Sequence, residues 1–227
     1  MMGRFVSRFN FELNQRKKTK QKIMGRVSDA KENLMDAVLE LIWTGSYGST
    51  TIDQICEKAG VKKGSFYYFF KSKADLAVAA LDEAYKEKRV EMDALFSPTI
   101  PPLDRIRNYL EACYQKQAEL KKECGCVLGC PLFTLGAEVS TQDQKLRAKI
   151  QQILEHYGKY IESAIRDAHA AGLVHAPDAA LKARVIRAYS EGLLTQARIQ
   201  NDVEVLRELP KGVLSILGAE QSEPVPA

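Results

Sequence analysis

Residues 50–76 have the sequence TTIDQICEKAGVKKGSFYYFFKSKADL, and this stretch decides the fold of the N-terminal part of the chain. Apolar residues recur from Ile52 to Ala59 at the spacing of one helical face, which predicts a short helix. Thr51 is a suitable N-cap, since its hydroxyl can accept a hydrogen bond from an unpaired backbone N–H. Gly60 follows, where helices commonly end in the left-handed conformation that glycine adopts without strain. The stretch therefore begins with a helix and a tight glycine turn.

A second short helix is predicted after the turn, and its first residues are basic or small: Lys62, Lys63, Gly64 and Ser65. In a helix-turn-helix protein, the N-terminal residues of the second helix meet base edges and phosphates in the major groove of DNA. The small side chains would let this helix approach the groove closely. The pattern therefore predicts a helix-turn-helix that binds double-stranded DNA.

The aromatic residues of the second helix divide between two faces. Phe66 and the later phenylalanines are spaced to anchor the helix in the core of the domain. Tyr67 and Tyr68 then point largely outward, where their hydroxyls suit phosphate oxygens, which take most protein–DNA hydrogen bonds. Ser72 can cap a third helix. Lys73 in the first turn of that helix would add charge to a phosphate contact through the helix N-terminus.

Two other interpretations compete with DNA binding. The first is a helical hairpin in an ordinary all-helical protein, with its lysines exposed to solvent. Between Lys58 and Lys73, however, the chain has no acidic residue, and an exposed aromatic pair is unfavourable unless it binds a partner. The second is a helical enzyme or scaffold without DNA binding, but no nucleophile with its base and no phosphate-binding loop is found. DNA binding without catalysis is therefore the favoured interpretation.

The same residues closely resemble the TetR family of bacterial transcription regulators. The resemblance covers about residues 28–81, and its specific runs are Ala37–Ile42, Gly45–Ile55, Ala59–Val61 and Gly64–Leu76. It implies that Lys62, Lys63 and Ser65 face bases or the nearby backbone, and that phosphates are held by Thr51, Tyr67, Tyr68 and Lys73. It also implies an all-helical homodimer, a divergent C-terminal domain with a small-molecule pocket, and repression that the ligand relieves.

Composition and charge indicate where the partners bind. The hydrophobic fraction of 45% is ordinary, and neither a membrane-spanning run nor a secretion signal is found, so we expect a cytoplasmic protein with no membrane partner. Of the net charge of +4, residues 1–27 supply +7 and the remainder −3. The basic cluster of residues 58–73, not the overall charge, therefore indicates DNA binding. Residues 1–24 are expected to be a flexible basic arm that adds nonspecific phosphate contacts, or a leader ahead of a natural start at Met24.

The whole chain is predicted to be all-α. We expect a three-helix helix-turn-helix domain over residues 25–76, a helical ligand-binding and dimerisation domain over 77–219, and a disordered tail over 220–227. A proline-rich break at residues 97–102 interrupts the helical pattern. The expected helices cover about residues 28–43, 52–59, 62–70, 73–96, 103–122, 131–139, 143–171, 178–199 and 201–217.

The helices over residues 143–171 and 178–199 have small and apolar faces that suit a four-helix bundle shared between two subunits. A two-fold dimer would present two reading heads to a palindromic operator. The alternative is a bundle formed within one chain. The predicted dimer interface consists of Ile161, Ile165, Val185, Tyr189, Gly192 and Gln196.

The effector is expected to bind between helices of the second domain, where small-molecule sites in bundles occur. Core packing would explain each candidate residue equally well, because most are aromatic or apolar. Glu138 is the exception, a carboxylate on an otherwise apolar helix that needs a partner if it is buried. The predicted pocket residues are Tyr109, Cys113, Gln117, Phe133, Glu138, His156, Tyr157, Tyr160 and Tyr189.

The five cysteines allow a second kind of trigger. Cys56 is expected in the core of the first domain. The others are Cys113 and the closely spaced Cys124, Cys126 and Cys130, which could be buried apolar fillers, a thiol sensor or ligands of a soft metal. Their spacing matches no standard zinc site, and Pro131 fits the first turn of a new helix. We therefore expect no metal or cofactor and favour the structural role. The alternative is a redox-sensing repressor that is triggered through Cys124, Cys126 or Cys130.

Overall fold

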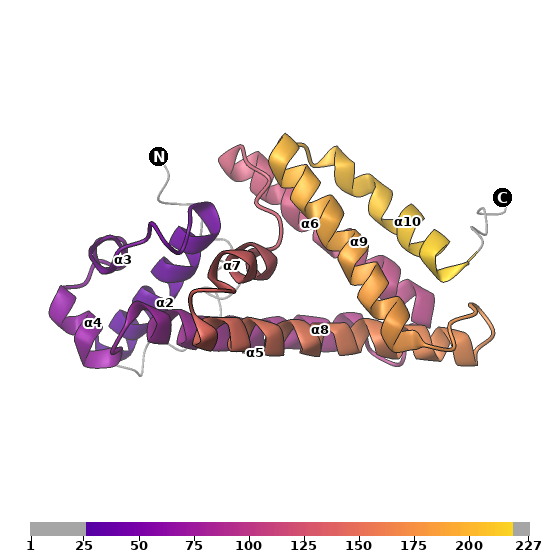
Figure 1. Ribbon diagram of the computed structural model, residues 1–227, viewed down its shortest axis with the longest axis horizontal. Helices are drawn as coiled ribbons and strands as arrows, with labels where there is room; N and C mark the ends of the chain where they lie inside the picture. The colour runs from indigo at the N-terminus through magenta and orange to yellow at the C-terminus, as the bar shows by residue number, and fades with distance from the viewer. Residues whose placement is uncertain (1–25, 220–227) are drawn as a thin grey trace. The chain divides into compact units, whose positions relative to one another are not determined.

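The computed structural model describes residues 26–219 and is all-helical over that range (Figure 1), which confirms the predicted fold class. The helices are α2 (Arg26–Thr44), α3 (Ile52–Ala59), α4 (Lys63–Phe69), α5 (Lys73–Leu95), α6 (Pro102–Cys124), α7 (Pro131–Val139), α8 (Gln144–Ala170), α9 (Ala179–Gln200), the 3-10 turn η2 (Glu204–Arg207) and α10 (Glu208–Leu217). The expected helices are present, although the last one divides into η2 and α10. The predicted basic arm and the predicted tail lie outside the described residues.

The chain forms two compact units, and neither is continuous in sequence. Unit 1 contains the described residues up to Tyr85 together with Pro131–Gln151, whereas unit 2 contains Lys86–Cys130 and the residues from Gln152 onward. This division differs from the predicted boundary after residue 76. The reason is that α7 returns to the first domain, where it packs against α2.

Unit 1 is called the head below. Its predicted helix-capping signals are confirmed. The Thr51 hydroxyl accepts a hydrogen bond from the Gln54 amide at 3.2 Å, and the Gln54 side chain accepts one from the Thr51 amide at 2.8 Å. These two bonds satisfy two backbone donors at the start of α3. Gly60 has a φ of 66°, the left-handed conformation expected at the end of that helix. Ser72 accepts from the Asp75 amide at 3.1 Å and so caps α5.

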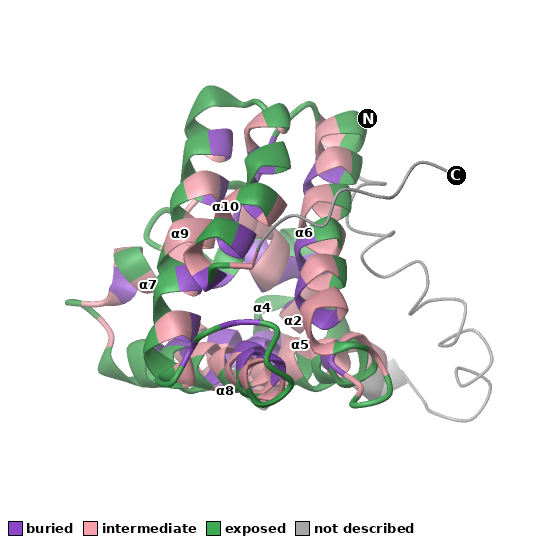
Figure 2. Ribbon diagram, turned by 90° about the vertical axis from the view of Figure 1, so that its right-hand side faces the viewer, coloured by how far each residue is buried: buried purple, intermediate pink, exposed green. Residues whose placement is uncertain are grey.

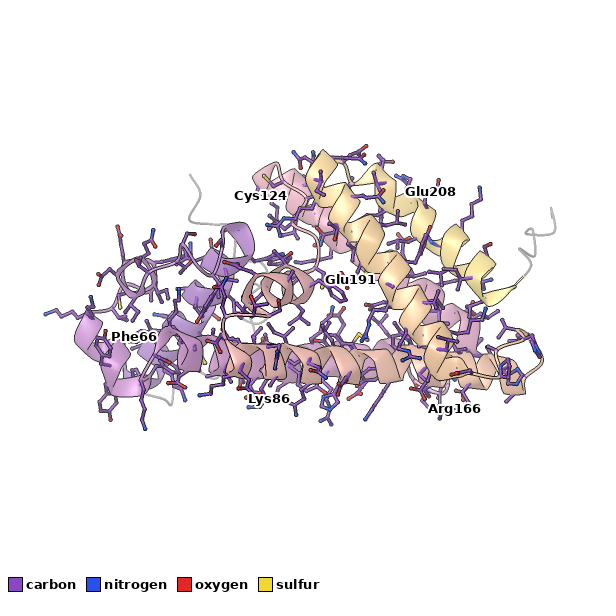
Figure 3. All side chains as sticks on the ribbon, viewed as in Figure 1. Phe66, Lys86, Cys124, Arg166, Glu191 and Glu208 are labelled. Carbon is purple, nitrogen blue, oxygen red and sulfur yellow. The ribbon has the colours of Figure 1, made fainter. Side chains whose placement is uncertain are left out.

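The head has an apolar core to which α2, α3, α4 and α5 each contribute. Leu34, Ile55, Phe66 and Leu76 come from four different helices, and each is 0% exposed. Burial of large apolar side chains is the main source of stability in so small a unit. Phe66 therefore fixes the position of α4, as Figure 3 shows by its place on that helix.

Unit 2 has a separate core between its own helices. Its largest fully buried members include Met92, Ile106, Leu110, Ile165, Ile186 and Leu206. Figure 2 shows buried residues alternating with exposed ones along α6, α9 and α10, as expected for amphipathic helices. No helix in the described part of the chain is long and apolar enough to span a bilayer.

Arg105 holds the proline-rich break in place. Its guanidinium is 5% exposed and forms an ion pair with Asp167 at 2.5 Å. It also donates to the carbonyl oxygens of Ile100 at 2.7 Å and Pro98 at 3.2 Å. A buried charge is tolerated when it is paired in this way. The break therefore has a defined structure that connects α5 to α6.

Candidate nucleic-acid interface

The recognition helix α4 exposes its aromatic residues as the sequence predicts. Tyr67 is 55% and Tyr68 77% exposed, while Phe66 on the opposite face is fully buried. The two phenol rings are therefore available to a partner outside the unit. Exposure of large aromatic side chains to water is unfavourable, whereas tyrosine hydroxyls beside basic side chains can donate hydrogen bonds to a phosphate backbone.

The fold does not require a glycine at position 64. A Cβ atom built at this position would meet no heavy atom within 4 Å. Glycine in a helix is unfavourable relative to alanine by about 1 kcal/mol, because it loses more backbone entropy. No positive φ requires glycine here. Neither packing within the described residues nor backbone conformation therefore requires glycine here, and the close approach of DNA to the first turn of α4 stays a prediction.

The two lysines at the start of α4 differ in their surroundings. Lys62 is the exposed N-cap residue, and its side chain makes no capping hydrogen bond. The Lys63 ammonium forms an ion pair with Asp53 at 2.8 Å, and this hydrogen bond raises the pKa of Lys63. Both partners are exposed, so the pair is weak and the ammonium can exchange Asp53 for a phosphate. Ser65 lies half-buried in the same turn.

Lys73 is engaged inside the head. Its ammonium donates to the carbonyl oxygens of Tyr47 at 2.6 Å and Thr50 at 2.7 Å, and it lies 4.1 Å from the centre of the Tyr47 ring. Burial lowers the pKa of Lys73. The expected phosphate contact stays a prediction, but the structure gives this side chain a role in holding the turn before α3. Thr51 is exposed while its hydroxyl caps α3.

The predicted pocket residues are divided between the two units. Phe133 and Glu138 belong to unit 1, and the other seven belong to unit 2. Both oxygens of the Glu138 carboxylate accept hydrogen bonds from the turn at residues 46–48. The Glu138 carboxylate is therefore engaged by this turn, and its contribution to an effector pocket stays a prediction.

Three further candidates have structural partners in unit 2. The buried Gln117 side chain accepts from the amides of Leu128 and Gly129 at 3.1 and 2.9 Å, so it fixes the loop before α7. Tyr160 donates to Asp93. The Tyr189 hydroxyl donates to the Glu208 carbonyl at 3.2 Å and lies against Gly212, where a Cβ would overlap it. Tyr189 therefore joins α9 to α10.

Of the four remaining candidates in unit 2, Tyr109 and Cys113 lie in a cluster of ionisable groups, whereas His156 and Tyr157 stay predictions. Burial raises the pKa of Glu191 to about 7, although a hydrogen bond with Cys130 and the charge of Arg187 oppose this. Oε2 of Glu191 is buried and accepts no hydrogen bond from the described residues. Cys113 and burial hold the pKa of Tyr109 well above its usual range. Convergent polar groups of perturbed pKa are typical of small-molecule sites.

Glu191, which Figure 3 labels on α9, is not among the pocket residues predicted from the sequence. A signal for it was present. Ala183, Ile186, Leu194 and Ala197 mark the buried face of this helix, and Glu191 lies beside that face. A carboxylate next to a buried stripe needs an explanation, because ionised groups are rarely desolvated without a partner.

The cysteines are not arranged as a metal site or a disulfide. All five lie in the described range, and no disulfide joins any of them. Among residues 26–219, no three His, Cys, Asp or Glu side chains are placed to hold a metal ion. Burial raises the pKa of Cys113 to about 11 and also raises that of Cys124. These thiols are therefore protonated at neutral pH, which makes them poor nucleophiles.

We expect iodoacetamide at pH 7 to alkylate the exposed Cys126 first and to leave Cys113 unmodified while the protein is folded. The reason is that alkylation requires an accessible thiolate, and Cys113 is less exposed than Cys126 and has a raised pKa, so its thiol is protonated at pH 7. Peptide mass spectrometry over a time course measures the order. Modification of Cys113 as fast as that of Cys126 would contradict the raised pKa of the Cys113 thiol.

A small head with an outward-facing recognition helix, joined to a separate helical unit, defines a helix-turn-helix transcriptional regulator. Comparison with known proteins agrees with this class. Residues 34–80 match the family described as bacterial regulatory proteins, tetR family, and residues 102–212 match the tetracyclin repressor-like C-terminal domain. The chain belongs to the TetR family.

Individual relatives match along most of their length. The chain is 31% identical over 176 residues to the transcriptional regulator AcuR of Cereibacter sphaeroides, covering 75% of this chain and 77% of AcuR. It is 26% identical over 196 residues to the transcriptional repressor NemR of Escherichia coli K12, covering 83% and 94%. The crystal structure of regulatory protein TetR from Rhodobacter sphaeroides superposes with a TM-score of 0.73 at 26% identity, covering 81% and 96%.

Proposed function

We propose that this protein is a homodimeric repressor that leaves a palindromic operator when a small molecule binds its second unit. The observation that carries the proposal is the exposed face of α4, where Tyr67, Tyr68 and two lysines surround an unobstructed glycine. The family membership and a relative named as a repressor support the direction of control. The ionisable cluster around Glu191 supports a polar effector site in unit 2.

The proposed dimer would use the outer face of α9. Leu181, Val185 and Ile199 on this helix are 47%, 43% and 78% exposed, which is unusual for large apolar side chains. Gly192 and Gln196 are exposed at matching helical positions, and a Cβ at Gly192 would meet no atom. These positions form one stripe suited to packing against a second copy.

Two of the predicted interface residues do not lie on that stripe. Ile161 is 4% and Ile165 0% exposed, because both pack in the core of unit 2 itself. They stabilise one subunit, so the proposed interface is restricted to α9. Tyr189 also makes its contacts to α10 within the chain.

In the dimer, two α4 helices would enter successive major grooves about 34–36 Å apart. An effector would release DNA by favouring a state with another separation, and only to the extent that it binds that state more tightly.

The test is DNA binding by a Lys62→Ala, Tyr68→Phe double variant. The wild type would first select duplexes from a random library, and fluorescence anisotropy would measure the affinity for the selected duplex. We expect about a tenfold loss for the variant and a salt dependence that is smaller by roughly one phosphate contact. Lys159→Ala removes the same charge from an exposed position in unit 2 and should bind like the wild type. A wild type that selects no duplex would refute the proposal.

A further inference from the structure

The segment after Cys130 connects the two units. Cys130 is the last residue of a unit 2 segment, and α7 begins at Pro131 as part of unit 1. The loop before it is fixed by Gln117, as described above. The shortest covalent path from this loop to α7 is therefore the single peptide bond between Cys130 and Pro131. The effect of a change in this loop on the head depends on the contacts that α7 makes there.

Glu138 near the end of α7 holds the turn between α2 and α3. Its Oε1 accepts from the Ser46 hydroxyl at 2.7 Å and from the Gly48 amide at 2.7 Å, and its Oε2 accepts from the Tyr47 amide at 2.9 Å. A Cβ at residue 48 would lie 3.1 Å from Oε1, so the backbone approaches the carboxylate closely. Three donors from consecutive residues thus converge on one carboxylate, a geometry that favours its ionised form.

Lys73 holds the same turn from the other side. It binds the carbonyl oxygens of Tyr47 and Thr50, whereas Glu138 binds the amides. Burial raises the pKa of Glu138, but the bonds from Ser46, Gly48 and Tyr47 and the charge of Lys73 outweigh it, so that the pKa is lowered overall. The two opposite charges therefore fix both the N–H and the C=O groups of the turn.

The turn leads directly into the recognition element. Thr50 ends it, with its hydroxyl donating to the Ser46 carbonyl at 2.6 Å, and Thr51 then caps α3. Since α3 packs against α4, a shift of the turn changes the placement of the recognition helix. On the basis of the proposed function, we infer that Glu138 is the positioning residue through which unit 2 controls DNA binding.

The experiment compares the wild type with Glu138→Ala, Glu138→Gln and a control, Glu119→Gln. The alanine variant removes every acceptor, while glutamine keeps the size and one carbonyl oxygen. Glu119 is an exposed carboxylate on α6, so its variant makes the same charge change away from the turn. Thermal unfolding identifies variants that fail to fold. If Glu138→Ala does not fold, the comparison is made with Glu138→Gln.

Hydrogen exchange provides the first measurement. We expect the amides of Tyr47 and Gly48 to exchange about tenfold faster in Glu138→Ala, less so in Glu138→Gln, and unchanged in Glu119→Gln. The duplex selected by the wild type should bind about tenfold more weakly to Glu138→Ala. Unchanged exchange at both amides, or unchanged affinity, would overturn the inference.

The coupling itself is measured without knowing the effector, because linkage is reciprocal. In the wild type, the selected duplex should change hydrogen exchange in residues 125–130, and in Glu138→Ala this change should be lost. An equal change in both proteins would overturn the inference while leaving DNA binding intact. A wild type that binds no duplex would instead refute the proposed function, and exchange at residues 47 and 48 would still test the anchor.

Discussion

Replacing Gly64 with leucine is expected to lower the affinity for operator DNA at least about 100-fold, close to 3 kcal/mol. The space around a Cβ at this position contains no protein atoms, so the side chain meets no obstacle inside the folded unit. Leucine also favours helix over glycine by almost 1 kcal/mol, and α4 should become more stable. The loss would therefore come only from the space that DNA must occupy. Thermal unfolding and anisotropy with the selected duplex measure the two effects separately.

Two further substitutions at the same position control for side-chain chemistry. Gly64→Gln is similar in size to leucine but polar, and it should lose affinity to a similar extent if bulk is the cause. Gly64→Ala adds one methyl group and should lose less. Should the leucine variant bind the duplex as tightly as the wild type, the first turn of α4 does not face the groove.

Replacing Glu191 with glutamine is expected to stabilise the protein at pH 8 by up to about 3 kcal/mol, with little effect at pH 4. Burial raises the pKa of Glu191 from 4.5 to about 7. Below pH 4.5 the carboxyl is protonated in both the folded and the unfolded chain, so it changes nothing. As the pH rises toward 7, the unfolded chain ionises first and the folded state loses relative stability. Glutamine cannot ionise and avoids this loss.

Thermal melts of the two proteins at half-unit steps between pH 4 and pH 8 measure the effect. The difference in stability should grow through the window between the two pKa values and level off above about pH 7. Glu119→Gln again serves as the control, since its carboxylate is exposed. A difference that is the same at every pH would show that folding does not shift the pKa of Glu191.

The helix-turn-helix could be predicted because its determinants are local. Thr51, Gly60 and Ser72 each specify a helix end through contacts with residues no more than a few positions away. The alternation of Phe66 with the outward tyrosines likewise follows from helical spacing alone. Such signals survive in a single sequence, because no distant segment is needed to complete them.

The roles of Glu138 and Lys73 could not be predicted because their partners are distant in sequence. Glu138 binds an amide 91 residues earlier in the chain, and Lys73 binds a carbonyl 26 residues earlier. From the sequence, a carboxylate on an apolar helix suits a ligand pocket, and a lysine at a helix start suits a phosphate. Only the folded unit shows that each charge is already engaged by the same turn.

The effector pocket was harder to predict for a different reason. Aromatic and apolar side chains between helices can either line a ligand pocket or pack in the core. Tyr189 illustrates this, because its hydroxyl donates a hydrogen bond to Glu208 in α10. A polar group beside a buried stripe separates a binding site from simple packing more clearly. The reason is that burial of a polar group without a partner is energetically unfavourable. Glu191 is such a group. The prediction from residue type selected mainly tyrosines and did not include it.

The return of α7 to the first unit also bears on the engineering of chimeric regulators. A designer who transplants residues 26–85 onto a foreign sensor domain would leave behind the carboxylate that organises the turn before α3. The portable DNA-reading module of this protein is therefore bipartite, and it must include Pro131–Gln151 as a second graft. Hybrids built by a single crossover in α5 would inherit whatever carboxylate, or lack of one, the donor happens to supply.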